Sequence, residues 1–227
     1  MIACLIPARS GSKRIKNKNI KKFYGKPLIE YSIDLAKKSK IFKEIYVSTD
    51  SKKIANLAYK KKINVPFLRP KIISNDTAND LDVLEHFINY IKKEKIKINY
   101  LCYLYPTTPL LNKKILIEFL NLIKIKKLDK VFTASEYNYP IQRSFTVINK
   151  KLIYKEKKYS KSRSQDLLKY FHDAGQCYWF NLSKIKNIRN EKNFNVGLIK
   201  LNYLDFYDLN TLDDFKILKK MYLIKNN

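Results

Sequence analysis

The sequence opens with MIACLIPARSGSKRIKNKN (residues 1–19), an apolar run followed at once by a polar, basic loop. Ile2–Pro7 has the length and apolar character of a buried strand. The loop after it contains Gly11 and several cations, of which Arg9 is the first. Glycine lets backbone N–H groups approach phosphate oxygens closely, and cations neutralise phosphate charge. The stretch therefore predicts a strand that ends in a phosphate-binding loop, with an ordinary basic surface loop as the alternative.

Two common phosphate-binding motifs do not describe this loop. The Walker pattern needs an earlier glycine and a Gly-Lys-Ser/Thr ending, and the loop has neither. The dinucleotide-binding pattern needs three glycines, whereas the loop has Gly11 alone. The sequence therefore does not favour a P-loop NTPase or a dinucleotide-dependent enzyme.

Apolar and amphipathic segments alternate through the first 134 residues. Strands are expected over Ile2–Pro7, Glu44–Thr49, Val65–Leu68, Tyr100–Tyr105 and Lys130–Ala134, and helices over 27–38, 51–61, 80–94 and 112–127. The alternation predicts a three-layer, Rossmann-like α/β fold with a mostly parallel sheet. Such sheets bind ligands at the carboxyl ends of their strands, so the loops after Pro7, Leu68 and Tyr105 are candidate site loops. Asp50 or Ser51 is expected to cap the helix over 51–61.

The alternation of strands and helices stops at residues 135–170, where short β-like pieces alternate with charged turns. We interpret this stretch as an inserted arm within a single domain of residues 1–227. The arm is too short to bury a core, yet it carries apolar residues such as Phe145 and Val147. It is therefore expected to mediate dimerisation, since a second copy can cover these residues; the alternative is a hairpin folded back on its own sheet.

After the arm, a strand is expected at Gly175–Asn181, one or two strands in Val196–Leu209, and a helix over 211–224 capped by Thr211.

Composition narrows the class of protein. The formal net charge is +27, but lysines recur along the whole chain, which is typical of solvated helix faces. A basic nucleic-acid-binding protein is kept as the less favoured alternative.

No run of 18 apolar residues occurs, so no membrane span is expected, and the N-terminus lacks a leader pattern, which favours a cytoplasmic location. Three scattered cysteines, Cys4, Cys102 and Cys177, are expected to be reduced core thiols, without a structural zinc site.

Several motifs, in order, resemble one known family. They are ARSGSKRI (8–15) with KNI (18–20), GKPLIEYSI (25–33), VSTD (47–50), RPKIISNDTANDLDVLEHFI (69–88), LYPTTPLL (104–111), RSQDL (163–167), HDAGQCYWFN (172–181) and DLNTLDDF (208–215). Together they resemble the CMP-nonulosonate synthetases, a branch of the glycosyltransferase-A-like nucleotidyltransferases. PIQR (140–143), RSQDL and HDAGQCYW resemble the pseudaminic acid cytidylyltransferases most. The N-acetylneuraminate enzymes usually have Gln in place of Tyr105 and Asn-Gly in place of Ala174-Gly175.

The resemblance implies an enzyme that joins CMP from CTP to the C2 hydroxyl of an acidic nine-carbon sugar, with Mg²⁺ as cofactor and pyrophosphate as the second product. Pseudaminic acid is the favoured sugar; a sibling enzyme for N-acetylneuraminate or legionaminate is the alternative. Related enzymes pair as homodimers, and one arm approaches the sugar pocket of its neighbour. The resemblance therefore implies CTP and the sugar as partners, without nucleic acid or membrane.

The resemblance also assigns roles to individual residues. Catalytic roles fall on Arg9, Lys18 and Asp208, and contacts to the nucleotide on Ser10, Gly11, Ser12, Lys13, Asn19, Arg69, Asp76, Ala78 and Asp80. Contacts to the sugar fall on Tyr105, Thr107, Gln142, Arg143, Arg163, Gln165, His172, Asp173, Gln176 and Tyr178. Asp208 and Asn210 match the metal-binding positions, where the family usually has Asp-x-Asp.

Two of these assignments have purely structural alternatives. Asp76 or Asn79 could simply cap the helix over 80–94. Asp208 and Asn210 could likewise do no more than cap the last helix.

Overall fold

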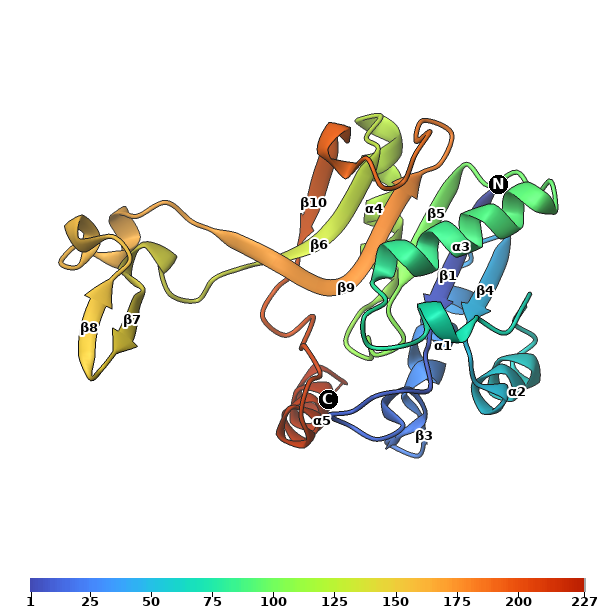
Figure 1. Cartoon of the computed structure of the whole chain (residues 1–227), viewed down its shortest axis with the longest axis horizontal. Helices are drawn as coiled ribbons and strands as arrows, with labels where there is room; N and C mark the ends of the chain where they lie inside the picture. Colours follow the sequence, from blue (N-terminus) through green and yellow to red (C-terminus); the bar gives the residue numbers. More distant parts are fainter. Residues whose placement is uncertain (227) are drawn as a thin grey trace.

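The computed structural model describes residues 1–226; Asn227, the last residue of the predicted domain, lies outside the described residues. A six-stranded sheet with the order β10-β6-β9-β5-β1-β4 forms the centre of the molecule (Figure 1). Its strands are β1 (Ile2–Pro7), β4 (Glu44–Ser48), β5 (Tyr100–Leu104), β6 (Lys130–Glu136), β9 (Phe171–Asn181) and β10 (Val196–Lys200). β9 runs antiparallel to both of its neighbours, and the other pairs are parallel. The predicted mostly parallel sheet is confirmed.

Helices cover the two faces of the sheet unequally. The α-helices are α1 (Leu28–Ser39), α2 (Lys52–Lys60), α3 (Asp80–Lys93), α4 (Lys113–Ile125) and α5 (Leu212–Asn226). Buried residues of α1, α2 and α4 share one core with the sheet, and α3 packs on the opposite face. Phe119 of α4 stacks on Trp179 of β9 with ring centroids 6.5 Å apart. A third cluster joins α5 to the basic loop through Ile15, Leu209 and Phe215.

Shorter elements complete the chain. Strands β2 (Lys22–Phe23) and β3 (Lys26–Pro27) form a small hairpin. The 3₁₀ helices are η1 (Lys18–Ile20), η2 (Lys71–Ile73), η3 (Ile141–Arg143), η4 (Lys157–Tyr159), η5 (Ser164–Asp166) and η6 (Glu191–Asn193). Cys4, Cys102 and Cys177 are buried and free, as the sequence predicts. Within residues 1–226, no helix is long and apolar enough to cross a membrane.

Two predicted strands differ from those observed. Val65–Leu68 is not a strand, because the region pairs only through isolated bridges such as Thr49 with Leu68. Pro66 lies inside it and lacks the N–H that a ladder needs. β9 begins at Phe171, earlier than Gly175, whereas Val196–Leu209 contains one strand, β10, within the expected one or two.

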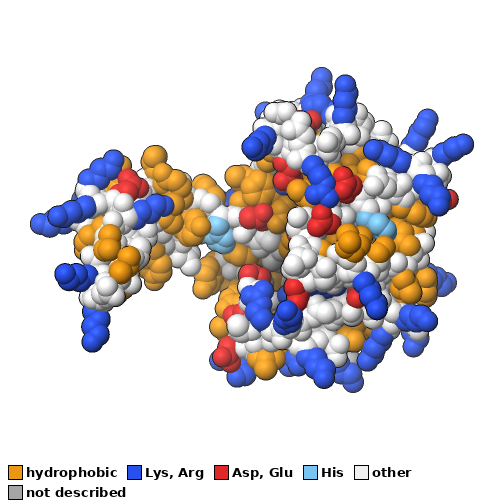
Figure 2. Space-filling model, viewed as in Figure 1, with side chains coloured by type: hydrophobic (Ala, Val, Ile, Leu, Met, Phe, Trp, Pro, Cys, Tyr) orange, Lys and Arg blue, Asp and Glu red, His pale blue; other side chains and the backbone are white. Residues whose placement is uncertain are grey.

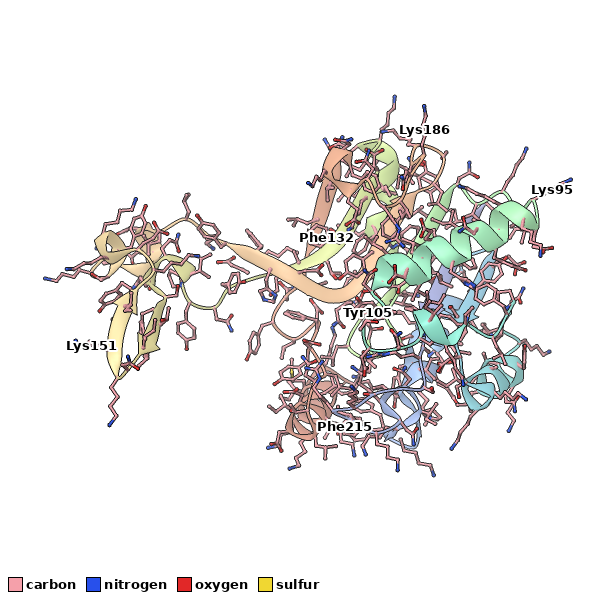
Figure 3. All side chains as sticks on the ribbon, viewed as in Figure 1. Lys95, Tyr105, Phe132, Lys151, Lys186 and Phe215 are labelled. Atoms are coloured by element: carbon pink, nitrogen blue, oxygen red, sulfur yellow. The ribbon has the colours of Figure 1, made fainter. Side chains whose placement is uncertain are left out.

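β6 and β9 stay paired with each other as far as Glu136 and Phe171, and residues 135–170, which we call the arm, extend from this end of the pair (Figure 1). Strands β7 (Phe145–Ile148) and β8 (Lys151–Tyr154) pair with each other as a separate antiparallel hairpin, and all their residues are exposed. Lys151, labelled in Figure 3, lies in this hairpin, far from Tyr105 at the centre of the molecule. Within the described chain, the hairpin therefore does not fold back on its own sheet.

One part of the sheet lacks a helical cover. α3 lies over β5, β1 and β4, whereas no helix lies in front of β10 and β6 (Figure 1). Val196 and Leu198 of β10 are 44% and 43% exposed. The molecule thus has two exposed apolar surfaces, one on the arm and one on this half of the sheet.

Candidate active site

The carboxyl ends of β1 and β4 are neighbours, since Pro7 pairs with Ser48 in a parallel register. Asp50, two residues after the end of β4, holds the loop that follows β1. The backbone N–H of Ser10 donates to Asp50 Oδ1 at 2.7 Å, and the Ser10 hydroxyl donates to Asp50 Oδ2 at 2.5 Å. Ser51, and not Asp50, caps α2, because its Oγ accepts from the N–H of Ile54. Asp50 therefore positions the basic loop, a role that the sequence analysis missed.

A cavity of about 400 Å³ opens at the carboxyl ends of β1 and β5. Eight predicted site residues line it: Arg9, Lys18, Asn19, Arg69, Ala78, Asp80, Tyr105 and Thr107. A second hollow of about 280 Å³ shares Arg9, Lys18 and Asn19 with the first. Its remaining lining is Gly11, Ser12, Lys13, Arg14, Asp76 and Asn210. The two hollows thus form one site that brings together the basic loop, the 69–80 segment and the 208–210 segment.

Lys18 lies between the basic loop and the segment that contains Asp208. Its ammonium donates to the carbonyl of Leu209 at 3.0 Å. Burial lowers the pKa of Lys18, and the nearby Asp208 carboxylate opposes that shift. Asn19 donates to the carbonyl of Arg9 at 2.9 Å, while its buried Oδ1 has no partner within the described chain. A buried acceptor without a partner is costly, so the site is incomplete without a ligand donor, a metal ion or water.

Asp76 is an ion-pair partner and does not cap a helix. Its carboxylate lies 3.1 Å from the guanidinium of Arg9 and 2.6 Å from the ammonium of Lys13. The hydrogen bond from Lys13 lowers the pKa of Asp76. Asn79 caps α3 through a reciprocal capping box with Asp82. An incoming phosphate therefore competes with Asp76 for two cations of the loop.

Tyrosines form the other wall of the cavity. Asp80 accepts hydrogen bonds from the hydroxyls of Tyr103, at 2.8 Å, and Tyr105. Burial raises the pKa of both tyrosines, so their hydroxyls stay protonated and donate. Tyr178 donates to Asp173 at 2.8 Å, and its ring lies 5.7 Å from that of Tyr105. Sequence reasoning missed Tyr103, although its position two residues before Tyr105 on a strand places both on one face.

The predicted sugar contacts of the arm do not line this cavity in their own chain. Gln142 is 4% exposed and donates to the carbonyl of Leu168 inside the arm. Arg143 donates to Ser164 at 3.2 Å, Arg163 pairs with Asp166 at 2.8 Å, and Gln165 is exposed in η5. Their roles toward a sugar stay predictions.

His172 and Gln176 lie on β9, between the arm and the cavity. The His172 ring packs between Tyr137, at 4.9 Å, and Phe206, at 6.0 Å, near the base of the arm. Gln176 is 3% exposed, and its amide donates to the carbonyls of Ala174 and Gly175. Both side chains therefore have structural partners, and neither lines the cavity.

Within the 208–210 segment, Asn210 lines the second hollow. The Asn210 amide N–H₂ donates to the Asp208 carboxylate, which leaves the Asn210 amide oxygen free of that contact. Thr211 caps α5, as predicted, because its hydroxyl accepts from the N–H of Asp214 at 3.1 Å. The carboxylate of Asp214 in turn accepts from the N–H of Asn210 at 2.9 Å. Asp208 and Asn210 are therefore not needed as caps.

The open α/β sheet, the basic loop on β1 and the oxygen ligands beside it define a nucleotidyltransferase-like enzyme. A family model described as "Cytidylyltransferase" matches residues 3–220. The chain belongs to the cytidylyltransferase family.

Individual relatives agree with membership of the cytidylyltransferase family. The chain is 37% identical over 227 residues to "Pseudaminic acid cytidylyltransferase" of Campylobacter jejuni subsp. jejuni serotype O:2, covering 98% of this chain and 97% of the relative. It is 37% identical over 108 residues, 48% of its length, to "CMP-N,N'-diacetyllegionaminic acid synthase" of Legionella pneumophila. CMP:2-keto-3-deoxy-manno-octonic acid synthetase, solved in complex with CTP, matches 99% of both chains with a TM-score of 0.69 and 15% identity, which shows a shared fold.

Asp50 and Ser51 are neighbours with separable roles, so their alanine variants should differ. Asp50→Ala should raise the KM for CTP about tenfold, because two hydrogen bonds to a carboxylate that fix the loop are lost. Ser51→Ala should leave that KM unchanged and lower the free energy of unfolding by about 1 kcal/mol through loss of the cap. Steady-state kinetics and urea unfolding of both variants test this; equal KM values for the two would contradict the role of Asp50.

Proposed function

We propose that this chain transfers CMP from CTP to the C2 hydroxyl of pseudaminic acid and releases pyrophosphate. The proposal rests on the composition of the cavity together with the similarity of the chain to its relatives. The cavity is lined by the basic loop, by the 69–80 segment and by Tyr105 with Thr107. The chain is 37% identical, over 98% of its length, to a relative named as a pseudaminic acid cytidylyltransferase. N-acetylneuraminate and legionaminate are the alternative sugars.

The triphosphate lies along the basic loop in this proposal. Backbone N–H groups around Gly11 point to phosphate oxygens, and Arg9, Lys13 and Lys18 neutralise their charge. Cytosine and ribose lie against the segment from Arg69 to Asp80, where buried Arg69 is fixed by a hydrogen bond to Ser74 at 3.0 Å. Tyr105 and Thr107 lie at the opposite wall, toward the sugar.

The residues present suit a magnesium ion bound together with the nucleotide. Mg²⁺ usually binds one or two protein carboxylates, substrate phosphates and water. Asp208 and the amide oxygen of Asn210 supply such ligands beside the phosphate hollow. The described residues contain no cluster of three acidic, His or Cys side chains that would hold a metal alone. When bound, the ion would neutralise triphosphate charge and orient the α-phosphate.

Catalysis then consists mainly of positioning and charge neutralisation by the chain's own residues. The oxygen of the sugar hydroxyl forms a bond to the α-phosphorus and loses its proton to solvent, and the bond from that phosphorus to the bridging oxygen of pyrophosphate breaks. Arg9 and Lys18 hold the oxygens on which charge develops. Lys18 is already fixed by its contact with Leu209, so it need not be reordered during the reaction.

The distribution of charge does not favour nucleic-acid binding. Figure 2 shows Lys and Arg side chains spread around the visible face without forming one stripe. Some of them serve the fold: Lys61 lies 2.8 Å from Glu30 and 3.4 Å from Asp34, and so links α2 to α1. A cytoplasmic location stays a prediction.

We also propose that the enzyme is a homodimer in which the arm of one protomer covers the site of its partner. Phe145, Val147 and Ile148 of the hairpin are 54%, 63% and 56% exposed. The sheet half that carries Val196 and Leu198 is a second apolar surface of matching character. A two-fold pairing would cover the arm of each protomer and could bring Arg143 or Arg163 to the sugar.

Asp208→Ala should lower the rate of pyrophosphate release with CTP and pseudaminic acid about a hundredfold or more, because charge stabilisation at the α-phosphate is lost. Asn210→Asp is the matched control and should keep its activity, since it restores the carboxylate usual in the family. A coupled pyrophosphate assay measures both. Near wild-type turnover of Asp208→Ala, with CTP consumed normally, would rule out its assignment.

Mixing two inactive variants tests the arm. Arg143→Ala and Asp208→Ala protomers should each be inactive alone, but a mixed dimer should have one working site by symmetry. That site combines an intact Asp208 with an intact Arg143 from the partner. Activity should therefore return on mixing and subunit exchange. A wild-type protein that sediments as a monomer while active would contradict the proposal.

A further inference from the structure

The segment 201–211 carries Asp208 and Asn210 but contains no helix or strand. It runs as a loop from the end of β10 to the start of α5 (Figure 1). Loops are the mobile parts of a fold unless side-chain contacts fix them. One such contact is already described, the bond from the Lys18 ammonium to the carbonyl of Leu209. The remaining contacts of the segment come from α5.

Asp214, on the first turn of α5, contacts the segment on both sides of Asp208. Its Oδ2 accepts from the N–H of Asn210 at 2.9 Å and from the N–H of Thr211 at 2.7 Å. Its Oδ1 accepts from the hydroxyl of Tyr207 at 3.4 Å. The bond from Thr211 belongs to the reciprocal cap of the helix. The bonds from Asn210 and Tyr207 lie outside that cap, so they hold the loop and not the helix.

Lys225, on the last turn of α5, contacts the same segment further upstream. Its ammonium pairs with the carboxylate of Asp205 and donates to the carbonyl of Leu110 at 2.7 Å. The side chains of Lys225 and Asp205 are 21% and 15% exposed, so water and salt screen this pair little. Asp205 also accepts from the N–H of Asn202 at 3.1 Å, which closes a turn. Lys225 therefore joins the segment to the loop that carries Thr107.

The helix that makes these contacts is itself packed against the basic loop. Phe215, labelled in Figure 3, and Leu218 of α5 lie in one apolar cluster with Leu209 of the segment and Ile15 of the basic loop. Leu209 is 2% exposed and Leu218 is fully buried. α5 thus supports both the basic loop and the segment 201–211, and it fixes one relative to the other.

From these contacts we propose that Asp214 and Lys225 are positioning residues for magnesium-assisted binding of CTP. They hold Asp208 and Asn210 at the place beside the basic loop where both can serve a magnesium ion bound with the triphosphate. The inference rests on the proposed function. Within the described chain, neither side chain lines the two hollows of the site, so each acts through the segment. Mg²⁺ demands nearly ideal octahedral geometry, so a small displacement of its ligands weakens binding.

Asp214→Ala and Thr211→Ala separate the loop contact from the helix cap. Both variants lose part of the cap, so both should unfold at a lower urea concentration than the wild type. Only Asp214→Ala also loses the bonds to Asn210 and Tyr207. It should reduce about tenfold the ratio of the Kd for CTP without Mg²⁺ to the Kd with Mg²⁺, as loss of an outer partner of a metal ligand does. Thr211→Ala should keep the wild-type ratio. Calorimetry with CTP, in EDTA and in Mg²⁺, measures it.

Lys225 gives an independent test with its own control. Lys225→Met should reduce the same ratio, and Lys225→Arg should restore it because the charge and the donors return. Lys216→Met removes a lysine of α5 that pairs with Asp213 on the exposed surface, and it should leave the ratio unchanged. Lys225→Met leaves Asp205 partly buried without its cation, which is destabilising. The double variant Asp205→Asn/Lys225→Met avoids that charge and should still show the reduced ratio.

Wild-type ratios in Asp214→Ala and in the Lys225 variants, with lowered stability alone, would show that the contacts only support the fold and would overturn the inference. A wild-type Kd for CTP that does not respond to Mg²⁺ would overturn it as well. Failure of the proposed function looks different, because these measurements need no sugar. In that case the wild-type enzyme binds CTP but releases no pyrophosphate with any nonulosonic acid.

Discussion

The pair of hydrogen bonds from Ser10 to Asp50 is the interaction on which the site depends. Parallel pairing of β1 and β4 brings the ends of these strands together, and Asp50 then fixes the loop that follows β1. A loop with so many cations repels itself and would otherwise spread into solvent. Fixing its backbone at Ser10 keeps the N–H groups and Arg9 directed toward a common centre. The rest of the site, including Lys18 and the 208–210 segment, packs around that centre.

Charge in the site is arranged for a ligand that is not part of the chain. Asp76 pairs with Arg9 and Lys13, so in the described chain these two cations have a partly exposed, exchangeable partner. A triphosphate offers more charge than one carboxylate and can replace it. The wall opposite the basic loop is formed by Asp80 and by Tyr103 and Tyr105, whose hydroxyls donate to it.

Much of the fold could be predicted from periodicity, since the main helices and most strands begin and end within a few residues of expectation. The position of the site also followed from one rule, because Pro7 and Tyr105 lie at carboxyl ends of neighbouring parallel strands. Long-range pairings could not be predicted. Asp50 looked like a helix cap, and only the register of β1 and β4 shows that it contacts Ser10. The pair of Lys130 with Glu191, 61 residues later, could not be predicted for the same reason.

The central claim is that this chain joins CMP to a nonulosonic acid at the site around Ser10 and Lys18. Phosphorus NMR of the purified enzyme with CTP, Mg²⁺ and pseudaminic acid tests it most directly, since it distinguishes every phosphorus-containing product. The three CTP resonances should give way to one phosphodiester signal and one pyrophosphate signal, and only when the sugar is present. Unchanged CTP, or conversion to CDP and inorganic phosphate, would contradict it.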